Sequence, residues 1–258
     1  MAAALPPSPA GLGRVLMWRG GSLWVSRDTG RAAPHAHHAI QITLAPLAAV
    51  RIRTAADAIW HEARASILMP DHAHEFDGGG QPVAIVFVEP ESLAGRALIA
   101  RYGCAPFAAI VDEHVLACAC ELLHAFAQGA DEARLIRGAQ QVVARIAGHV
   151  AMPAPLDPRI AAAVEWLRER IDRPVTLAQA ASVAHLSPSR FRHLFVAQTG
   201  VSFRAYLLWA RVNRAIVRGM AGASWTEAAQ ASGFADSAHL SRTCRRMFGI
   251  APSMLARE

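Results

Sequence analysis

The sequence has no long apolar run, few cysteines and no lysine. Apolar residues make up 53% of its 258 residues, but Arg, Asp, Glu or His interrupts them throughout. No run approaches the roughly 18 residues that span a bilayer, so we expect no membrane segment. The first 14 residues, MAAALPPSPAGLGR, lack the basic start and apolar block of a secretory signal. These absences favour a soluble, cytoplasmic protein.

Cysteine usage and the lack of catalytic motifs exclude further classes. Cys104, Cys118, Cys120 and Cys244 lack the paired spacing of a zinc module, and we expect them to be reduced thiols. No nucleophile, base and orienting group can be identified, because the available serines lack the surrounding motif of a hydrolase. The sequence therefore predicts neither catalysis nor a cofactor.

Positive charge is confined to the C-terminal part of the chain. Residues 1–156 carry 12 Arg and 13 acidic residues, a net charge of −1, whereas residues 157–258 carry 14 Arg and 7 acidic residues, a net charge of +7. Such asymmetry indicates an anionic partner for one domain only. The alternative on charge alone is a basic face that is simply solvated.

The chain length and the apolar periodicity predict two domains. Six short runs between residues 15 and 88 are typical of strands in a sandwich or small barrel: VLMW, SLWVS, AIQITLA, VRIRT, ASILMP and PVAIVFVE. From residue 91 apolar residues recur three and four apart, which predicts helices over 91–102, 113–129 and 131–150. Three prolines in AMPAPLDP then indicate a linker. We therefore expect a first domain over residues 1–150, a linker over 151–157 and a second domain over 158–258.

The second domain contains one pattern twice. Thr176-Leu-Ala-Gln179 and Ser224-Trp-Thr-Glu227 are capping boxes 48 residues apart, and each opens a short predicted helix. A tight turn and a second helix follow in both copies, with Ser187 as N-cap in the first. The offset grows to 49 beyond the turns, which implies one extra residue in the second turn. A short helix, a turn and a second helix form the helix-turn-helix, whose second helix fits the major groove.

Residues 203–220 between the two copies predict a long connecting helix, and the whole stretch resembles a known family. TLAQAA, LSPSRFRHLF, QTGVSFRAYL, ARVNRA and GFADSAHLSRTCRRMFGIAPS are similar to the DNA-binding domain of AraC/XylS-type regulators. The resemblance implies an all-α domain of seven helices and a bipartite DNA site, and it leaves the sign of regulation open between activator and repressor. It departs at His185, where a turn glycine is usual, and at Cys244, where a core aromatic is usual.

Polar residues on the two second helices are the candidates for DNA contact. The predicted base readers are Ser189, Arg190, Arg192 and His193 on the first helix and Ser237, His239 and Arg242 on the second. Arg can bond O6 and N7 of guanine together, whereas a phosphate contact carries no sequence information. We assign Arg245 and Arg246 to phosphates. For any single Arg, a solvated position remains the alternative.

The first domain resembles the cupin-like effector barrels that are fused to AraC-type domains, and its histidines cluster near strand ends. The predicted effector-pocket residues are His35, His37, Trp60, His72 and His74. Histidines two apart on a strand point the same way, so His37, His38, His72 and His74 form the alternative, a metal site. Because the spacing matches metal-dependent cupins only approximately, the sequence favours a pocket without metal.

Three function classes follow from these features. The favoured one is a transcription regulator that binds double-stranded DNA, responds to a small molecule and works with RNA polymerase. The others are a cupin-type metal-binding enzyme or sensor with a DNA-binding appendage, and an architectural DNA binder. An apolar stripe over residues 135–146 indicates either core or a homodimer interface.

Overall fold

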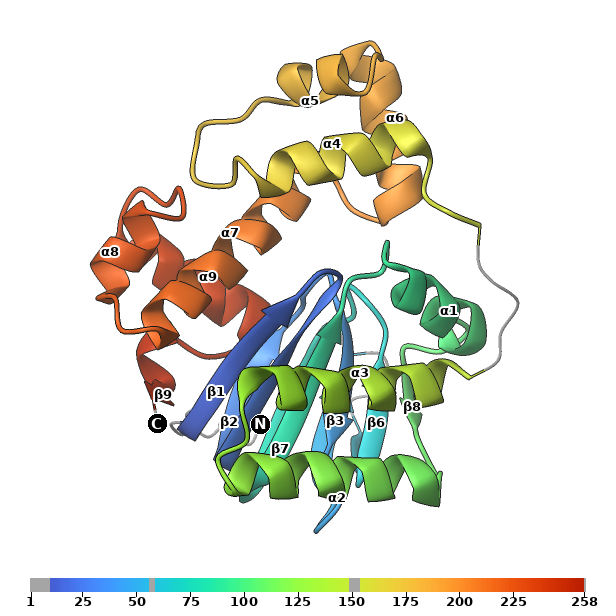
Figure 1. Ribbon diagram of the computed structural model, residues 1–258, viewed down its shortest axis with the longest axis vertical. Coiled ribbons are helices and arrows are strands. Elements are labelled where there is room, and N and C mark those ends of the chain that lie inside the picture. Colours follow the sequence, from blue (N-terminus) through green and yellow to red (C-terminus); the bar gives the residue numbers. More distant parts are fainter. Residues whose placement is uncertain (1–9, 56–58, 149–153, 258) are drawn as a thin grey trace.

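The computed structural model describes residues 10–55, 59–148 and 154–257, which form a sheet-rich N-terminal domain and a helical C-terminal domain (Figure 1). The strands are β1 (Ala10–Trp18), β2 (Gly21–His35), β3 (Ile40–Leu44), β4 (Val50–Thr54), β5 (Trp60–Ala63), β6 (Ala65–Leu68), β7 (His74–Val88), β8 (Phe107–Ala109) and β9 (Leu255–Arg257). The helices are α1 (Leu93–Tyr102), α2 (Glu113–Ala127), α3 (Glu132–Ala147), α4 (Pro158–Arg168), α5 (Leu177–Val183), α6 (Pro188–Thr199), α7 (Phe203–Met220), α8 (Trp225–Gln230) and α9 (Ser237–Phe248). None of the helices in these ranges has the length and apolar character needed to cross a membrane.

Two long antiparallel strands organise the sheet, whose main order is β8-β6-β3-β7-β2-β1-β9. β2 pairs with β7 from Gly21 opposite Val88 to His35 opposite His74, and the register shifts after Ser26. β4 pairs with the first part of β7, and β3 pairs with the last part. No pairing among the described residues joins β8 to β9. The sequence therefore predicted the sheet-rich domain correctly, but the sheet does not close into a barrel.

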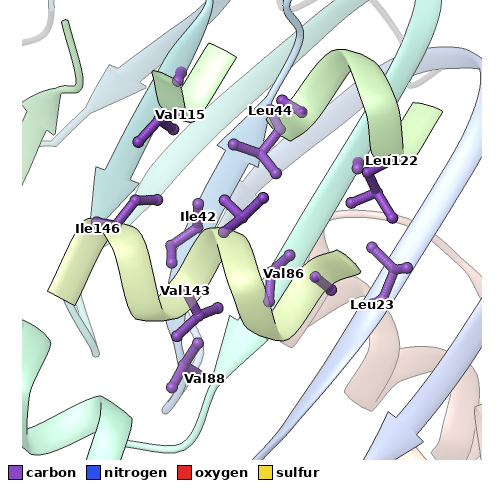
Figure 2. Close-up of a cluster of buried hydrophobic side chains, with 14 of the residues drawn as sticks. Leu23, Ile42, Leu44, Val86, Val88, Val115, Leu122, Val143 and Ile146 are labelled. Carbon is purple, nitrogen blue, oxygen red and sulfur yellow. The ribbon is translucent and has the colours of Figure 1, made fainter. Parts of the chain in front are cut away.

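One face of the sheet packs against α1, α2 and α3. Figure 2 shows the centre of this core, where Leu23, Ile42 and Val86 of the sheet meet Leu122 of α2 and Val143 of α3. Strand side chains alternate between the two faces, so these apolar positions all point to the helices. The apolar stripe of α3 is buried in this core, which decides between the two roles that its sequence allowed.

The opposite face of the sheet meets the C-terminal domain. Trp24 and Phe87 on the sheet pack against Trp209 of α7 and Phe248 of α9, and the ring centroids of Trp24 and Phe248 are 4.7 Å apart. The short strand β9 adds to the sheet parallel to β1. The two predicted domains thus share one apolar core.

The element predictions held except where pairing depends on distant residues. All six predicted strands and all three predicted N-terminal helices are present, and α4 begins at Pro158 with Asp157 as its N-cap. β5, β8 and β9 were missed because each has only three or four residues and forms through its neighbours. Of the predicted linker, residues 151–153 lie outside the described residues, and residues 154–157 have no regular structure.

Candidate nucleic-acid interface and cavity

The first helix-turn-helix unit, α5 to α6, has the expected caps. The Thr176 hydroxyl accepts from the backbone N–H of Gln179, whose side chain accepts from the N–H of Thr176 in return. His185 in the turn has φ 52°, so it adopts the left-handed conformation that glycine adopts freely. Ser187 caps α6. His185 therefore adopts a conformation that is more usual for glycine, at a cost in backbone strain of about 1 kcal/mol.

The second unit, α8 to α9, repeats this geometry with one extra turn residue. Ser224 and Glu227 form the second capping box, Gly233 with φ 79° occupies the place of His185, and Asp236 caps α9. Cys244, at the other departure, is 1% exposed within the core. Both α6 and α9 end at a left-handed glycine. The prediction of two matched units is confirmed.

The candidate base readers on the first unit are on the solvent face of α6. Ser189, Arg190, Arg192 and His193 are all exposed, while Phe191 and Phe195 are buried in the core of the unit. These four residues lie in the first half of the helix. The N-terminal end of α6 can therefore approach another molecule without rearrangement of its side chains.

The candidates on α9 are less uniform. Arg242, Arg245 and Arg246 are exposed, but Ser237 and His239 are half-buried. The His239 ring packs edge-on against Phe234, with the centroids 5.1 Å apart. Arg242 is therefore the most accessible of the three predicted base readers on this helix.

α7 joins the two units as a single helix of 18 residues. Its first turn supplies Phe203 to the core of the first unit, and its middle supplies Trp209 to the core shared with the sheet. Phe203, Leu207 and Ala215 are buried along one side of the helix, and Ala210 is half-buried. Burial of Tyr206, Trp209 and Val212 as well shows that α7 packs on more than one side.

A cavity lies between the sheet and the C-terminal domain. Its empty volume is about 780 Å³, open solvent at the mouth included. Trp24, Ile85 and Phe87 line it from the sheet, and Phe248 and Ile250 line it from the C-terminal domain. The predominantly apolar wall is typical of a small-molecule site.

The predicted pocket histidines do not all reach this cavity. His35 lines it, whereas His72 is exposed and Trp60 lies beside the guanidinium groups of Arg51 and Arg53 on β4. His37 and His74 are buried next to His35. The sequence could not distinguish these positions, because the curl of β2 and β7 decides which imidazoles meet.

His35, His37 and His74 form a buried cluster, and each offers a ring nitrogen within 4.8 Å of the others. Burial lowers the pKa of His35 to about 3 and that of His37 to about 4, and it holds the pKa of His74 well below its usual value. The three rings are therefore neutral at pH 7. Of the alternative metal set, His37 and His74 belong to this cluster and His38 and His72 do not.

His38 instead belongs to a polar network between the domains. Its Nε2 lies 3.3 Å from Oε2 of Glu91, and the neighbouring Glu89 forms an ion pair with Arg168 of α4. Burial and the charge of Glu91 raise the pKa of Glu89 to about 7, although Arg168 opposes the shift. Burial also disfavours ionisation of Glu91, but the hydrogen bond with His38 holds its pKa below the usual value. No sequence motif signalled this network.

Comparison with known proteins supports the assignment of the C-terminal domain. Residues 180–258 match the helix-turn-helix domain family. The uncharacterized HTH-type transcriptional regulator YpdC of Escherichia coli (strain K12) is 30% identical over 88 residues, 34% of this chain and 31% of that protein. The chain therefore spans about a third of this curated relative.

Similarity to solved structures extends over both domains. ToxT from Vibrio cholerae O395 has a TM-score of 0.60 and 13% identity, over 92% of this chain and 99% of that one. A ToxT structure from strain SCE256, with an unsaturated fatty acid bound, has a TM-score of 0.54 and 13% identity over 92% and 97% of the two chains. At this identity the similarity establishes a common two-domain fold.

Proposed function

We propose that this protein is a sequence-specific DNA-binding transcription regulator of the AraC type, since residues 180–258 match the helix-turn-helix domain family. Two capped units with exposed, Arg-bearing second helices carry the proposal. In this function α6 and α9 enter two successive major grooves about one helical turn apart, and α7 holds their spacing.

The exposed side chains divide into two proposed roles. Ser189, Arg190, Arg192 and His193 of α6 would read bases in one groove, and Arg242, with Ser237 and His239 beside it, would read bases in the other. Arg245 and Arg246 lie in the last turn of α9, away from the end that points into the groove. Their charge suits phosphate contact, which adds affinity for any sequence.

Selection of bound duplexes from a random pool by the purified chain tests the proposal. We expect a motif with two half-sites about one helical turn apart. Arg242→Ala should weaken binding to the selected site by roughly 5- to 150-fold and binding to random DNA much less, since a bidentate contact to guanine contributes about 1–3 kcal/mol. Arg246→Ala should weaken binding to the selected site and to random DNA alike. It should also reduce the slope of log affinity against log salt concentration by about 1.

Arg137→Ala is the matched control, because Arg137 is equally exposed but lies on α3 in the N-terminal domain. Equal losses on both DNAs for Arg242→Ala would remove Arg242 from the base readers. Failure to enrich any motif would overturn sequence-specific binding.

The cavity is the proposed effector site, and a carboxylic acid with an apolar body is its proposed occupant. Its lining is apolar apart from a few groups that include Arg14 and Arg31, whose guanidinium groups also contact Glu132 and Asp77. The fatty acid in the ToxT structure belongs to this chemical class. Occupancy would bias how the sheet and the C-terminal domain pack, and so the placement of α9 on DNA. Contact with RNA polymerase and homodimerisation complete the proposed activator.

Titration with a long-chain monounsaturated carboxylate tests the effector site. Tryptophan fluorescence monitors binding, because Trp24 lines the cavity. Ile250→Trp should fill the cavity and abolish binding, while Ile136→Trp, at a half-buried position on α3 outside the cavity, should not. The corresponding alcohol should bind more weakly. Unchanged binding to Ile250→Trp would place the ligand elsewhere.

A further inference from the structure

The buried histidine cluster lies where β2 ends and β7 begins, against the C-terminal domain. His35 and His74 are directly paired across the two strands, and their ring centroids are 4.0 Å apart. His37 follows β2 and lies 5.1 Å from His74, centroid to centroid. The three side chains are 7%, 3% and 2% exposed. Three imidazoles at this depth need a reason to be together, because burying a polar ring without a partner is costly.

The same nitrogen, Nδ1, bonds to a backbone carbonyl oxygen in each ring of the cluster. Nδ1 of His35 lies 2.7 Å from the carbonyl oxygen of Ala33, and Nδ1 of His37 lies 2.9 Å from that of Ala39. Nδ1 of His74 lies 3.0 Å from the carbonyl oxygen of His72. A carbonyl oxygen only accepts, so each Nδ1 carries the proton and each Nε2 presents a lone pair. Metal-binding histidines are held in this way, with the second ring nitrogen donating to a backbone carbonyl or carboxylate.

The lone pairs on Nε2 of His74 and His37 face no hydrogen-bond donor as the side chains are oriented. Nε2 of His74 is buried without a hydrogen bond. Nε2 of His37 lies 3.0 Å from Oε1 of Gln41, which is an acceptor facing an acceptor as the amide is placed. A cation bound to Nε2 of His37 and His74 would satisfy both nitrogens, and Oε1 of Gln41 is in place as a further ligand.

The spacing suits a small divalent transition-metal ion. Zn–N distances of about 2.0–2.1 Å in a tetrahedral site put two ligand nitrogens about 3.4 Å apart. The candidate nitrogens lie within 4.8 Å of one another, so side-chain rotations that close each pair by at most about 1.4 Å complete the site. Three neutral imidazoles favour zinc and its neighbours over magnesium or calcium, which prefer oxygen ligands.

The cluster also contacts the second helix-turn-helix unit. The backbone N–H of Ala33 donates to the carbonyl of Gly249, 3.1 Å away, at the end of α9. A Cβ at Gly249 would lie 2.8 Å from Nδ1 of His35, so the glycine lets the two segments approach. The His37 ring lies 6.4 Å from that of Phe248. Contraction of the cluster would therefore act on the contact between the sheet and α9.

We propose that His35, His37 and His74 bind one zinc-like divalent ion, and that the ion strengthens the packing of α9 on the sheet. The ion site goes beyond the proposed function and does not depend on it. The effect on DNA binding rests on the proposed function, and it makes the metal a second regulatory ligand beside the cavity.

Metal titration of untagged, full-length protein tests the site after treatment with a chelator. We expect one Co²⁺ per chain with the visible absorption of a tetrahedral complex, displaced by Zn²⁺, and a rise in Tm on adding Zn²⁺. His37→Gln and His74→Gln should lower the Co²⁺ affinity at least tenfold and abolish the rise in Tm. His72→Gln is the matched control, because this exposed histidine is two residues from His74 and outside the cluster.

The Tm of each variant and of the unmodified chain, both measured with chelator, shows whether a variant has lost its fold as well as its metal. If His37→Gln or His74→Gln fails to fold, His35→Gln at the cavity wall is measured in its place. Absence of stoichiometric binding by the unmodified chain would overturn the site. Equal Co²⁺ affinity in His74→Gln and His72→Gln would also overturn it.

The affinity for the selected duplex, measured with and without Zn²⁺, tests the regulatory effect. We expect a change of several-fold for the unmodified chain and for His72→Gln, and none for His74→Gln. Stoichiometric metal binding that leaves DNA affinity unchanged would retain the site and overturn the coupling. If no duplex is selected, the proposed function fails and the Co²⁺ titration alone still decides the site.

Discussion

Replacing Glu89 by Gln should remove a pH dependence that the contact between the two domains gives to stability. Glu89 follows β7 and forms an ion pair with Arg168 of α4, while Glu91 lies close by. Its side chain is 18% exposed. Burial and the charge of Glu91 raise its pKa from 4.5 to about 7. Gln keeps the shape and an acceptor for Arg168, but it cannot ionise.

The sign and size of the effect follow from this shift. A carboxyl whose pKa is raised on folding favours the folded state fully below pH 4.5, and this contribution is lost as the pH rises through 7. Between pH 5 and pH 8 the loss amounts to about 2 to 3 kcal/mol for a single group. Groups that do not contact Glu89 cancel in the difference between the two proteins, which therefore reports Glu89 together with its coupled neighbour Glu91. The free energy of unfolding of Glu89→Gln, relative to that of the unmodified chain, should therefore rise by about 2 to 3 kcal/mol from pH 5 to pH 8.

Urea unfolding of both proteins at intervals between pH 5 and pH 8, monitored by tryptophan fluorescence, measures the difference in their stability. Glu121→Gln, an exposed carboxyl on α2, is the control and should track the unmodified chain. Arg168→Met should steepen the loss with pH, because it removes the cation that favours the ionised form of Glu89. A stability difference between Glu89→Gln and the unmodified chain that stays constant within about 0.5 kcal/mol would refute the reasoning.

Three further predictions concern the backbone and core of the C-terminal domain. His185→Gly should stabilise the chain by up to about 1 kcal/mol in urea unfolding by relieving its positive φ, and a loss of stability would show that the side chain outweighs the strain. Gly249→Ala should lower the free energy of unfolding by at least about 2 kcal/mol more than Gly200→Ala. Both glycines have positive φ, but a Cβ at Gly249 would lie 2.3 Å from a backbone carbonyl oxygen, whereas nothing lies within 4 Å of one at Gly200. Burial raises the pKa of Cys244 to about 12, so a thiol reagent at pH 8 should label exposed Cys104 rapidly and Cys244 only on unfolding; similar rates for both would contradict its burial.

Local chemistry made the helix-turn-helix units predictable. Capping boxes at Thr176 and Ser224 act within four residues, and a glycine in the left-handed conformation ends each second helix. Such signals need no knowledge of the rest of the fold. The His185 departure could also be located from the sequence, because the second unit has Gly233 at the equivalent position.

The contact between the domains could not be predicted, because it depends on which faces meet. Trp209 has the same apolar character as residues in the core of the first unit, and only the fold places it against Phe87 of the sheet. His35 and His74 were both candidates, but their pairing depends on the register of two long strands through a break after Ser26. The sequence set the residue types, and tertiary packing decided their partners.

The two helix-turn-helix units are attached to the sheet by different interactions. The first unit packs around its own aromatic core, and among the described residues its ion pairs with the N-terminal domain join Arg168 to Glu89 and Glu165 to Arg19. The second unit shares an apolar core with the sheet through Phe248. Partly exposed ion pairs contribute little to stability, whereas the burial of aromatic rings contributes much. The second contact is therefore the stiffer of the two.

α7 connects these two contacts, and its position determines how a change at one would reach the other. Phe203 at its start is in the first core and Trp209 at its middle is in the core shared with the sheet. A ligand or ion that shifts α9 on the sheet would move the helix as a rigid body, since α7 has no proline and no break along its 18 residues. The polar contact at Glu89 would yield first, because it is the weaker one. Under the proposed function, binding beneath the second unit would thus reorient the first unit relative to the sheet, while the core shared with α9 would stay intact.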